Sequence, residues 1–147
     1  MSSKLPKFTV IFCFSILFFL VQPKTPAHSA VIVAKVDLSQ QRMNVYVNGK
    51  REYVWPVSTG KKGWPTPTGS FRPYKMHRNY YEKYWRANLP YLVAVYRGIA
   101  IHGTNATHKL GRPASHGCIR LSIGNASKFY SLVEKHGLRN TRVVVTQ

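Results

Sequence analysis

The dipeptide Asn48-Gly49 separates two strand-like stretches, and it limits the possible fold more than any other feature of the sequence. Apolar residues occupy every second position of residues 43–47, and residues 50–57 continue on the other side. Asn-Gly is favoured in two-residue hairpin loops, because both central positions of the type I′ turn need positive φ. The sequence therefore predicts an antiparallel β-hairpin over residues 43–57.

The rest of the chain supplies further short runs that are rich in β-branched and aromatic residues and are bounded by turn residues. Such residues favour strands. Because short strands outnumber helices, we expect one mainly β domain, an antiparallel sandwich or barrel. Residues 77–90 differ, since their aromatic side chains cluster without period two, and there we expect a long, partly helical loop. The strand-like runs span residues 31–36, 68–74, 91–96, 98–102 and 142–146.

One helix is expected soon after residue 121. Its apolar residues recur at spacings of three and four, which places their side chains on a single helix face. Ser122 or Asn125 is suited to cap the start of this helix, and Gly137 is suited to end it. The apolar stripe consists of Ala126, Phe129, Tyr130 and Val133.

The N-terminus has the pattern of an export signal. Two lysines precede an uncharged, mostly apolar run at residues 8–21, and small residues follow before position 31. The run is shorter than the roughly 20 residues that a membrane-spanning helix needs. We therefore expect residues 1–30 to be a signal peptide that is cleaved after Ala30. Cleavage after Ala27 or Ser29, or an uncleaved anchor, are the alternatives.

Removal of that signal would leave residues 31–147 as a single domain with one cysteine, Cys118. We expect this domain in the periplasm or cell-wall space, with no stable membrane anchor. Exported proteins usually pair their cysteines, because their compartment is oxidising. An unpaired one indicates a reactive thiol or an intermolecular disulfide. The alternative is a buried, inert thiol, which the flanking His116 and Gly117 make less attractive.

The chain is strongly basic, with a net charge of +18. The first 30 residues hold three of the 22 basic residues and none of the four acidic ones, so residues 31–147 carry +15. Such a charge favours an anionic partner. Export and the absence of a nucleic-acid-binding motif argue against nucleic acid. Cell-wall polymer, anionic lipid or acidic stem peptides fit better, and a general solubility charge is the alternative.

Residues 102–121 combine histidines, glycines and the lone thiol. His116 and Cys118 are two positions apart, so in an extended chain they share a face. His102 ends an apolar run and is followed by Gly103. A thiol with an ordinary pKa of about 8.5 needs an imidazole nearby to react at neutral pH, and either histidine could supply it. Alternatively, the two histidines, Cys118 and His108 could form a tetrahedral metal site, although the chain has no regular ligand pair.

The segments Ile101-His102-Gly103-Thr104 and Ser115-His116-Gly117-Cys118-Ile119-Arg120 resemble the signature of the L,D-transpeptidase catalytic (YkuD) domain family. They are most similar to its enterobacterial-type branch, which has IHGTN and SHGC with an Arg two positions after the Cys. The resemblance includes residues 57–60 and 66–71 and extends from about residue 31 to the C-terminus. It implies a β-sandwich-like fold with a catalytic Cys near a helix, and no metal or other cofactor.

The resemblance also implies roles for individual residues. Cys118 would be the nucleophile and His102 the proton donor and acceptor, oriented by the backbone carbonyl of Gly103. His102 arrives from a separate strand, which leaves it free to face the leaving amine, so we expect His116 to support the loop and substrate binding instead. The backbone N–H groups of Gly117 and Cys118 would stabilise an oxyanion. Candidate substrate-binding residues are Arg120, Thr104, Asn105, Ser115, Tyr84 and Trp85, of which Arg120 could equally brace the loop.

The expected substrates are peptidoglycan stem peptides. Cys118 would attack the amide at the L-centre of a diamino acid in a tetrapeptide stem, D-alanine would leave, and an amine would resolve the thioester. That amine would belong to another stem or to a lysine of a wall-anchored lipoprotein. L,D-carboxypeptidase activity, with water as the acceptor, and a non-catalytic basic cell-wall-binding module are the alternatives. We expect the aromatic residues of 77–90 to form a lid whose basic residues face the wall; capping of the core is the alternative.

Overall fold

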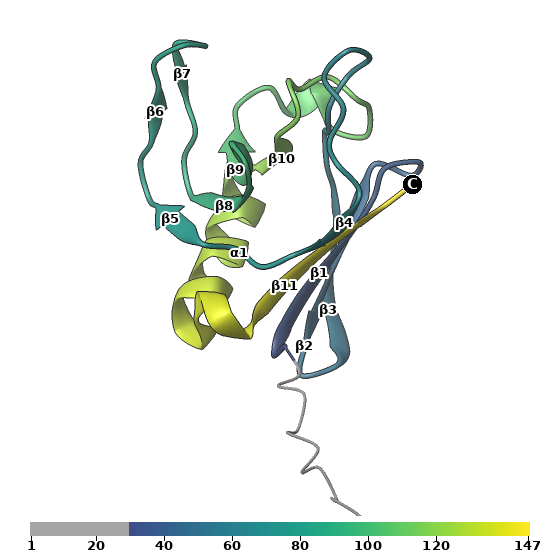
Figure 1. Cartoon of the computed structure of the whole chain (residues 1–147), viewed down its shortest axis with the longest axis vertical. Coiled ribbons are helices and arrows are strands. Elements are labelled where there is room, and N and C mark those ends of the chain that lie inside the picture. The colour runs from purple at the N-terminus through teal and green to yellow at the C-terminus, as the bar shows by residue number, and fades with distance from the viewer. Residues whose placement is uncertain (1–29) are drawn as a thin grey trace, which may run out of the picture.

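A computed structural model describes residues 30–147, in which two β-sheets and one helix surround a common core (Figure 1). The predicted signal peptide lies, except for its last residue, outside the described residues. The first sheet has the strand order β3-β2-β1-β11-β4 and the second has the order β10-β9-β8-β5. The strands of the first are β1 (Ile32–Asp37), β2 (Arg42–Val47), β3 (Lys50–Pro56), β4 (Gly69–Phe71) and β11 (Thr141–Thr146). Those of the second are β5 (Lys75–His77), β8 (Leu92–Tyr96), β9 (Ile99–Thr104) and β10 (Ile119–Ser122).

The predicted hairpin is confirmed as the antiparallel pair β2–β3, with Val47 opposite Lys50. Asn48 and Gly49 both have positive φ, 49° and 82°, as the two-residue turn requires. The mainly β class is confirmed too, but the expected antiparallel pairing is only part of the pattern. Strand β1 pairs in parallel with β11, and β9 pairs in parallel with β10.

The parallel pairs follow from long connections that local sequence patterns do not reveal. Parallel neighbours need a crossover of a dozen residues or more. Residues 105–118, which include the 3-10 turn η1 (Thr107–Lys109), carry the chain from β9 back to the start of β10. The parallel partners β1 and β11 are the first and last strands of the described chain, so no short turn constrains their direction.

Helix α1 (Ile123–His136) packs mainly on β9 and β10 and reaches β1 of the other sheet (Figure 1). Its predicted apolar stripe is buried in the core. Ser122 is the N-cap, and its Oγ accepts a hydrogen bond from the Asn125 N–H at 3.3 Å. Gly137, with φ of 88°, ends the helix as expected, and the turn η2 (Leu138–Asn140) leads into β11. No helix of residues 30–147 is long and apolar enough to cross a membrane.

The prediction of a partly helical loop over residues 77–90 is wrong, because this segment forms the hairpin β6 (Tyr81–Glu82) and β7 (Ala87–Asn88). In Figure 1 the hairpin projects beyond the second sheet. The Glu82 carboxylate accepts a hydrogen bond from the Tyr84 N–H at 3.0 Å, and Arg86 has a positive φ of 48°. These local features favour a turn over a continuing helix.

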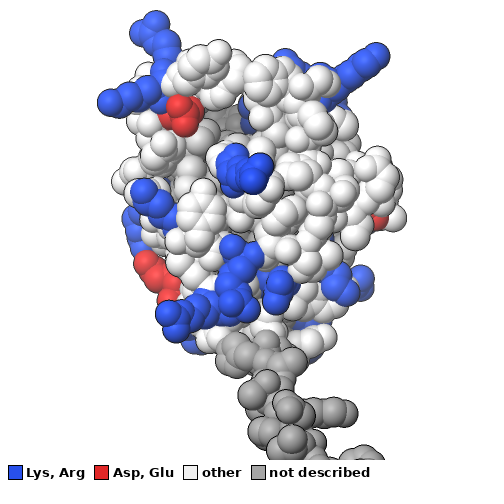
Figure 2. All heavy atoms as spheres, in the orientation of Figure 1, with Lys and Arg blue, Asp and Glu red and all other residues white. Residues whose placement is uncertain are grey.

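Lysine and arginine side chains dominate the charged surface of the face shown in Figure 2, where acidic ones are few. Two ion pairs occur within residues 30–147: Lys50 with Glu52 at 3.3 Å, and Arg78 with Glu134 at 3.6 Å. Most of the positive charge therefore has no acidic partner in the described chain.

Candidate active site

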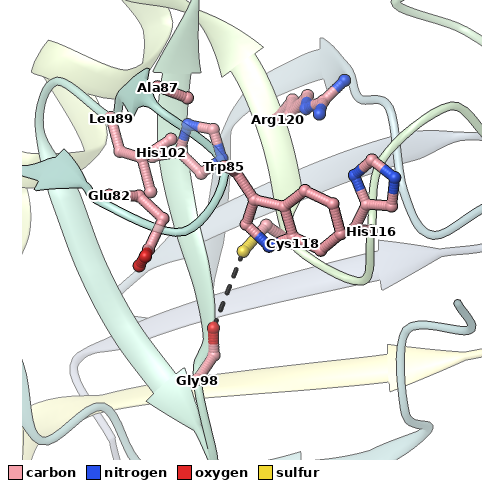
Figure 3. A pocket seen from close by; sticks show the side chains of 9 residues that line it. All are labelled: Glu82, Trp85, Ala87, Leu89, Gly98, His102, His116, Cys118 and Arg120. Carbon is pink, nitrogen blue, oxygen red and sulfur yellow. Dashed lines mark hydrogen bonds between the residues drawn. The ribbon is translucent and has the colours of Figure 1, made fainter.

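The parallel pairing of β9 with β10 brings His102 and Cys118 to one place. Arg120 lies opposite His102 in the register, and Cys118 precedes β10 directly, beside the start of β9. Both side chains line the same cavity, together with His116 and Arg120 (Figure 3). His102 is only 4% exposed, whereas Cys118 is partly open to solvent. Two residues that are 16 positions apart in the chain are thus brought to one cavity by neighbouring strands.

The loop before Cys118 is held in shape from within. Ser115 Oγ donates a hydrogen bond to the Cys118 carbonyl at 2.6 Å and accepts one from the Gly117 N–H at 3.1 Å. Ser115 is fully buried and does not line the cavity. Since the Gly117 N–H is directed to Ser115, the Cys118 N–H is the better placed of the two candidate oxyanion donors. Gly117 itself has φ of +108°, and an added Cβ would lie 2.7 Å from Ile99 Cδ1.

Residues 58–66 also hold the cysteine loop in place through hydrogen bonds. Ser58 and Arg120 exchange two backbone hydrogen bonds, at 2.9 and 3.0 Å. Thr66 Oγ1 donates to the Gly117 carbonyl at 2.7 Å and accepts from the Gly60 N–H at 2.9 Å. The Ser-Thr-Gly and Thr-Pro-Thr-Gly motifs therefore position the cysteine loop without lining the cavity themselves.

The Cys118 thiol and the His102 imidazole are both neutral at neutral pH. Burial lowers the pKa of His102 to about 4, although its hydrogen bond to the Gly103 carbonyl opposes the shift. Burial also raises the pKa of Cys118. The Cys118 thiol donates to the Gly98 carbonyl, with an S···O distance of 3.7 Å, and the Ala100 N–H donates to the sulphur.

The backbone carbonyl of Gly103 fixes the orientation of the His102 ring. Nδ1 of His102 lies 2.9 Å from the Gly103 oxygen. A carbonyl oxygen only accepts, so Nδ1 carries the proton and Nε2 is left as an acceptor. A neutral imidazole with a free Nε2 is the form that can take a proton from a thiol.

Trp85 and His116 form an aromatic wall of the cavity. Trp85, from the turn of the β6–β7 hairpin, stacks on His116 with ring centres 4.1 Å apart and planes inclined by 9°. Trp64 contacts both rings edge-on. Burial lowers the pKa of His116, and the positive charges of Lys61 and Arg120 lower it further. Tyr84 contacts Trp85 edge-on but is 80% exposed and does not line the cavity.

Thr104 and Asn105 lie elsewhere. They line a separate cavity with residues of the β6–β7 region, and Thr104 Oγ1 accepts the Ala106 N–H in a local turn. His108 is exposed in η1. Within residues 30–147, no three His, Cys, Asp or Glu side chains gather closely enough to hold a metal ion. The alternative of a metal site formed by His102, His108, His116 and Cys118 is therefore not supported by the described residues.

Two residues that the sequence interpretation missed also contact this region. Trp64 lies in a loop rich in Gly, Lys and Pro, and the only feature of the sequence that could have indicated its role is a single tryptophan in such a loop. Glu82 lines the cavity at Cys118 and also lines a second cavity that includes Cys118. Leu89 and Gly98 are shared by both cavities as well. Cys118 and Glu82 therefore both line the two cavities.

Comparisons with known proteins show which family this chain resembles in sequence and fold. The family model of the YkuD L,D-transpeptidase catalytic domain matches residues 32–145. A Bacillus subtilis (strain 168) protein assigned as an L,D-transpeptidase, YkuD, is 27% identical over 115 residues, which cover 76% of this chain and 64% of that protein. An L,D-transpeptidase structure from Mycobacterium tuberculosis H37Rv superposes with a TM-score of 0.72 at 27% identity, covering 80% of this chain and 58% of that one.

A third relative extends the comparison. The L,D-transpeptidase (Yku) structure from Stackebrandtia nassauensis superposes with a TM-score of 0.71 at 27% identity, over 82% of this chain and 57% of that one. The chain spans less than two thirds of the length of each of these three proteins. The family match nevertheless covers almost all of the described residues, and this chain belongs to the YkuD family of L,D-transpeptidase catalytic domains.

Proposed function

We propose that this chain is an exported, cysteine-dependent L,D-transpeptidase that acts on peptidoglycan stem peptides through a thioester on Cys118. The observation that carries the proposal is the shared cavity of Cys118 and His102, with Nδ1 of His102 fixed by the Gly103 carbonyl. A nucleophile, a base and a group that orients the base form the arrangement that nucleophilic catalysis needs. The family membership supports the same reaction class.

In the first half-reaction, the Cys118 sulphur attacks the carbonyl carbon at the L-centre of a tetrapeptide stem, and His102 Nε2 takes the thiol proton. Since the thiol and the imidazole are both neutral at neutral pH, the proton leaves the sulphur as the C–S bond forms. The Cys118 N–H is suited to stabilise the oxyanion. When the C–N bond breaks, His102 returns the proton to the nitrogen, and D-alanine leaves.

Arg120 is the cavity residue suited to bind the carboxylate of that D-alanine. Arg120 lines the cavity together with Cys118 (Figure 3), and its backbone is fixed by two hydrogen bonds with Ser58. An Arg side chain recognises a planar carboxylate through two parallel hydrogen bonds. Its Nη1 lies 3.4 Å from the Ala114 carbonyl, so the same residue also braces the loop.

In the second half-reaction an amine attacks the thioester, the C–S bond breaks, and Cys118 regains its proton. The amine of a second stem would give a cross-link, and a lysine of a wall-anchored lipoprotein would give an attached protein. Water as the acceptor would give L,D-carboxypeptidase activity. The net positive charge of residues 31–147 supports an anionic cell wall in the periplasm or cell-wall space as the working environment.

The test is mass spectrometry of purified tetrapeptide muropeptides after incubation with the protein. We expect loss of D-alanine and formation of cross-linked or exchanged products, and we expect neither with Cys118→Ala. Far-ultraviolet circular dichroism of the variant controls for its fold. A purely wall-binding module would bind sacculi equally well with and without the thiol and would leave the muropeptides unchanged, and that result would overturn the proposal.

A further inference from the structure

Glu82 is the only carboxylate that lines either cavity at Cys118 within residues 30–147. The other three acidic residues have evident local partners. Glu52 and Glu134 form ion pairs with Lys50 and Arg78, and Asp37 accepts hydrogen bonds that close a turn. An acidic side chain beside a reactive thiol in a strongly basic protein therefore needs a separate explanation.

The Glu82 carboxylate is held in place but not neutralised. Its Oε1 accepts the Tyr84 N–H at 3.0 Å, and its backbone pairs with Ala87 in the β6–β7 hairpin. No residue of 30–147 forms an ion pair with it, although basic residues far outnumber acidic ones. One carboxylate oxygen is thus left for a ligand, and the half-buried side chain lines both cavities.

Groups of opposite charge lie on different sides of the Cys118 thiol. In Figure 3 the Glu82 carboxylate and the Gly98 carbonyl lie on one side of the sulphur, and Arg120 and His116 lie on the other. The negative charge of Glu82 contributes to the raised pKa of Cys118, which is consistent with its closeness to the thiol. One side of the nucleophile therefore offers hydrogen-bond acceptors and a negative charge, which suits a cation, and the other offers a positive charge, which suits an anion.

The Gly98 carbonyl gains an unused acceptor position when the enzyme is acylated. In the free protein this oxygen accepts the thiol proton of Cys118 at 3.7 Å. A thioester sulphur has no proton, so acylation removes that donor. A carbonyl and a carboxylate next to the thioester are then both free to accept hydrogen bonds from an incoming ammonium group.

We propose that Glu82, together with the Gly98 carbonyl, binds the ammonium group of the acceptor and so directs the thioester toward amines rather than water. This inference rests on the proposed function. In the aminolysis step, the acceptor ammonium first loses one proton to solvent through the Glu82 carboxylate. The amine nitrogen then bonds to the thioester carbon, the C–S bond breaks, and a second proton of the nitrogen returns to the sulphur through His102.

A substitution of Glu82 by Gln separates this role from a structural one. The amide oxygen of Gln can still accept the Tyr84 N–H, so the turn of the β6–β7 hairpin keeps its hydrogen bond. Only the negative charge is lost. Glu52→Gln is the matched control, because Glu52 lies on β3, pairs with Lys50 and lines neither cavity.

The experiment measures how the acyl-enzyme formed from a tetrapeptide donor divides between water and an added nucleophile. Two nucleophiles are compared: Nα-acetyl-lysine amide, which is cationic at pH 7, and methoxyamine, which is uncharged. Products are quantified by mass spectrometry as the ratio of aminolysis to hydrolysis. For Glu82→Gln we expect a ratio about 10-fold lower with the lysine derivative, as for loss of one hydrogen bond to a charged group, and an unchanged ratio with methoxyamine.

Each outcome decides a specific point. Equal ratios for Glu82→Gln and the wild type with both nucleophiles would overturn the role of Glu82 while leaving the transpeptidase proposal intact. A ratio that falls equally for both nucleophiles would show a structural effect and would also overturn it. A wild-type protein that forms no acyl-enzyme would refute the proposed function and this inference with it. Glu52→Gln is expected to match the wild type throughout.

Discussion

Acidification provides a direct test of the buried, neutral state of His102. The imidazole is 4% exposed, and burial lowers its pKa to about 4 from an unfolded value of 6.5. Between these two values the unfolded chain binds more protons than the folded one, so stability rises with pH. The contribution of His102 is therefore fully present above pH 6.5 and is lost as the pH falls toward 4.

The size of the effect follows from the same two values. A difference of about 2.5 pKa units corresponds to about 3 kcal/mol, at about 1.4 kcal/mol for each unit. We expect the wild-type protein to lose this amount of unfolding free energy between pH 7 and pH 4, in addition to losses that arise from carboxylates. The pKa of Asp37 is lowered by its hydrogen bond from Ser39, so Asp37 also contributes to the acid-dependent loss.

The assay is urea-induced unfolding, followed by tryptophan fluorescence at pH 7, 6, 5 and 4. His102→Gln removes the titrating group but keeps every carboxylate, so the difference in slope between wild type and variant isolates His102. His108→Gln, at an exposed position in η1, controls for the loss of an imidazole elsewhere and should follow the wild-type slope. If His102→Gln and the wild type lost stability in parallel, His102 would not be buried in the neutral form.

Three further predictions concern the surroundings of the thiol. Ser115→Ala leaves the Gly117 N–H without its partner and should lower the unfolding free energy by about 1–3 kcal/mol and slow acylation; unchanged urea unfolding would contradict this. His116→Ala removes the ring on which Trp85 stacks, so we expect KM to rise more than kcat falls. A selective loss of kcat would instead assign His116 a role in proton transfer. Replacing the exposed Lys83 and Arg86 by Gln should weaken binding to sacculi at low salt, whereas Arg78→Gln, whose charge is already paired, should have a smaller effect; equal binding by all variants would exclude this electrostatic contact.

Local sequence patterns predict most of the elements of this fold. The Asn48-Gly49 turn and the apolar stripe of α1 can be predicted from the sequence, because each depends on residues that are close together in the chain. The parallel pairings of β1 with β11 and of β9 with β10 are not visible, because they depend on contacts between distant segments. The β6–β7 hairpin was missed because its strands are only two residues long and its aromatic residues have no clear period.

The candidate site divides in the same way. His102 and Cys118 stand out in the sequence through their glycine-flanked motifs, and the structure brings them into one cavity. Ser115 has the sequence context of a site residue, yet it is fully buried and holds the loop instead. Glu82 has no motif around it, and its position beside the thiol depends on the fold of a distant hairpin.

The rate at which a tetrapeptide donor acylates Cys118 tests most directly whether Cys118 is the nucleophile and His102 its base. This rate is measured by rapid quenching and intact-protein mass spectrometry, and peptide mapping locates the adduct. We expect an adduct on Cys118 whose mass equals that of the donor minus D-alanine. We also expect His102→Ala to slow formation of this adduct by about 10²–10⁴-fold, and His116→Ala to slow it far less. An adduct on another residue, or equally fast acylation in His102→Ala, would contradict the assignment of Cys118 as nucleophile and His102 as its base.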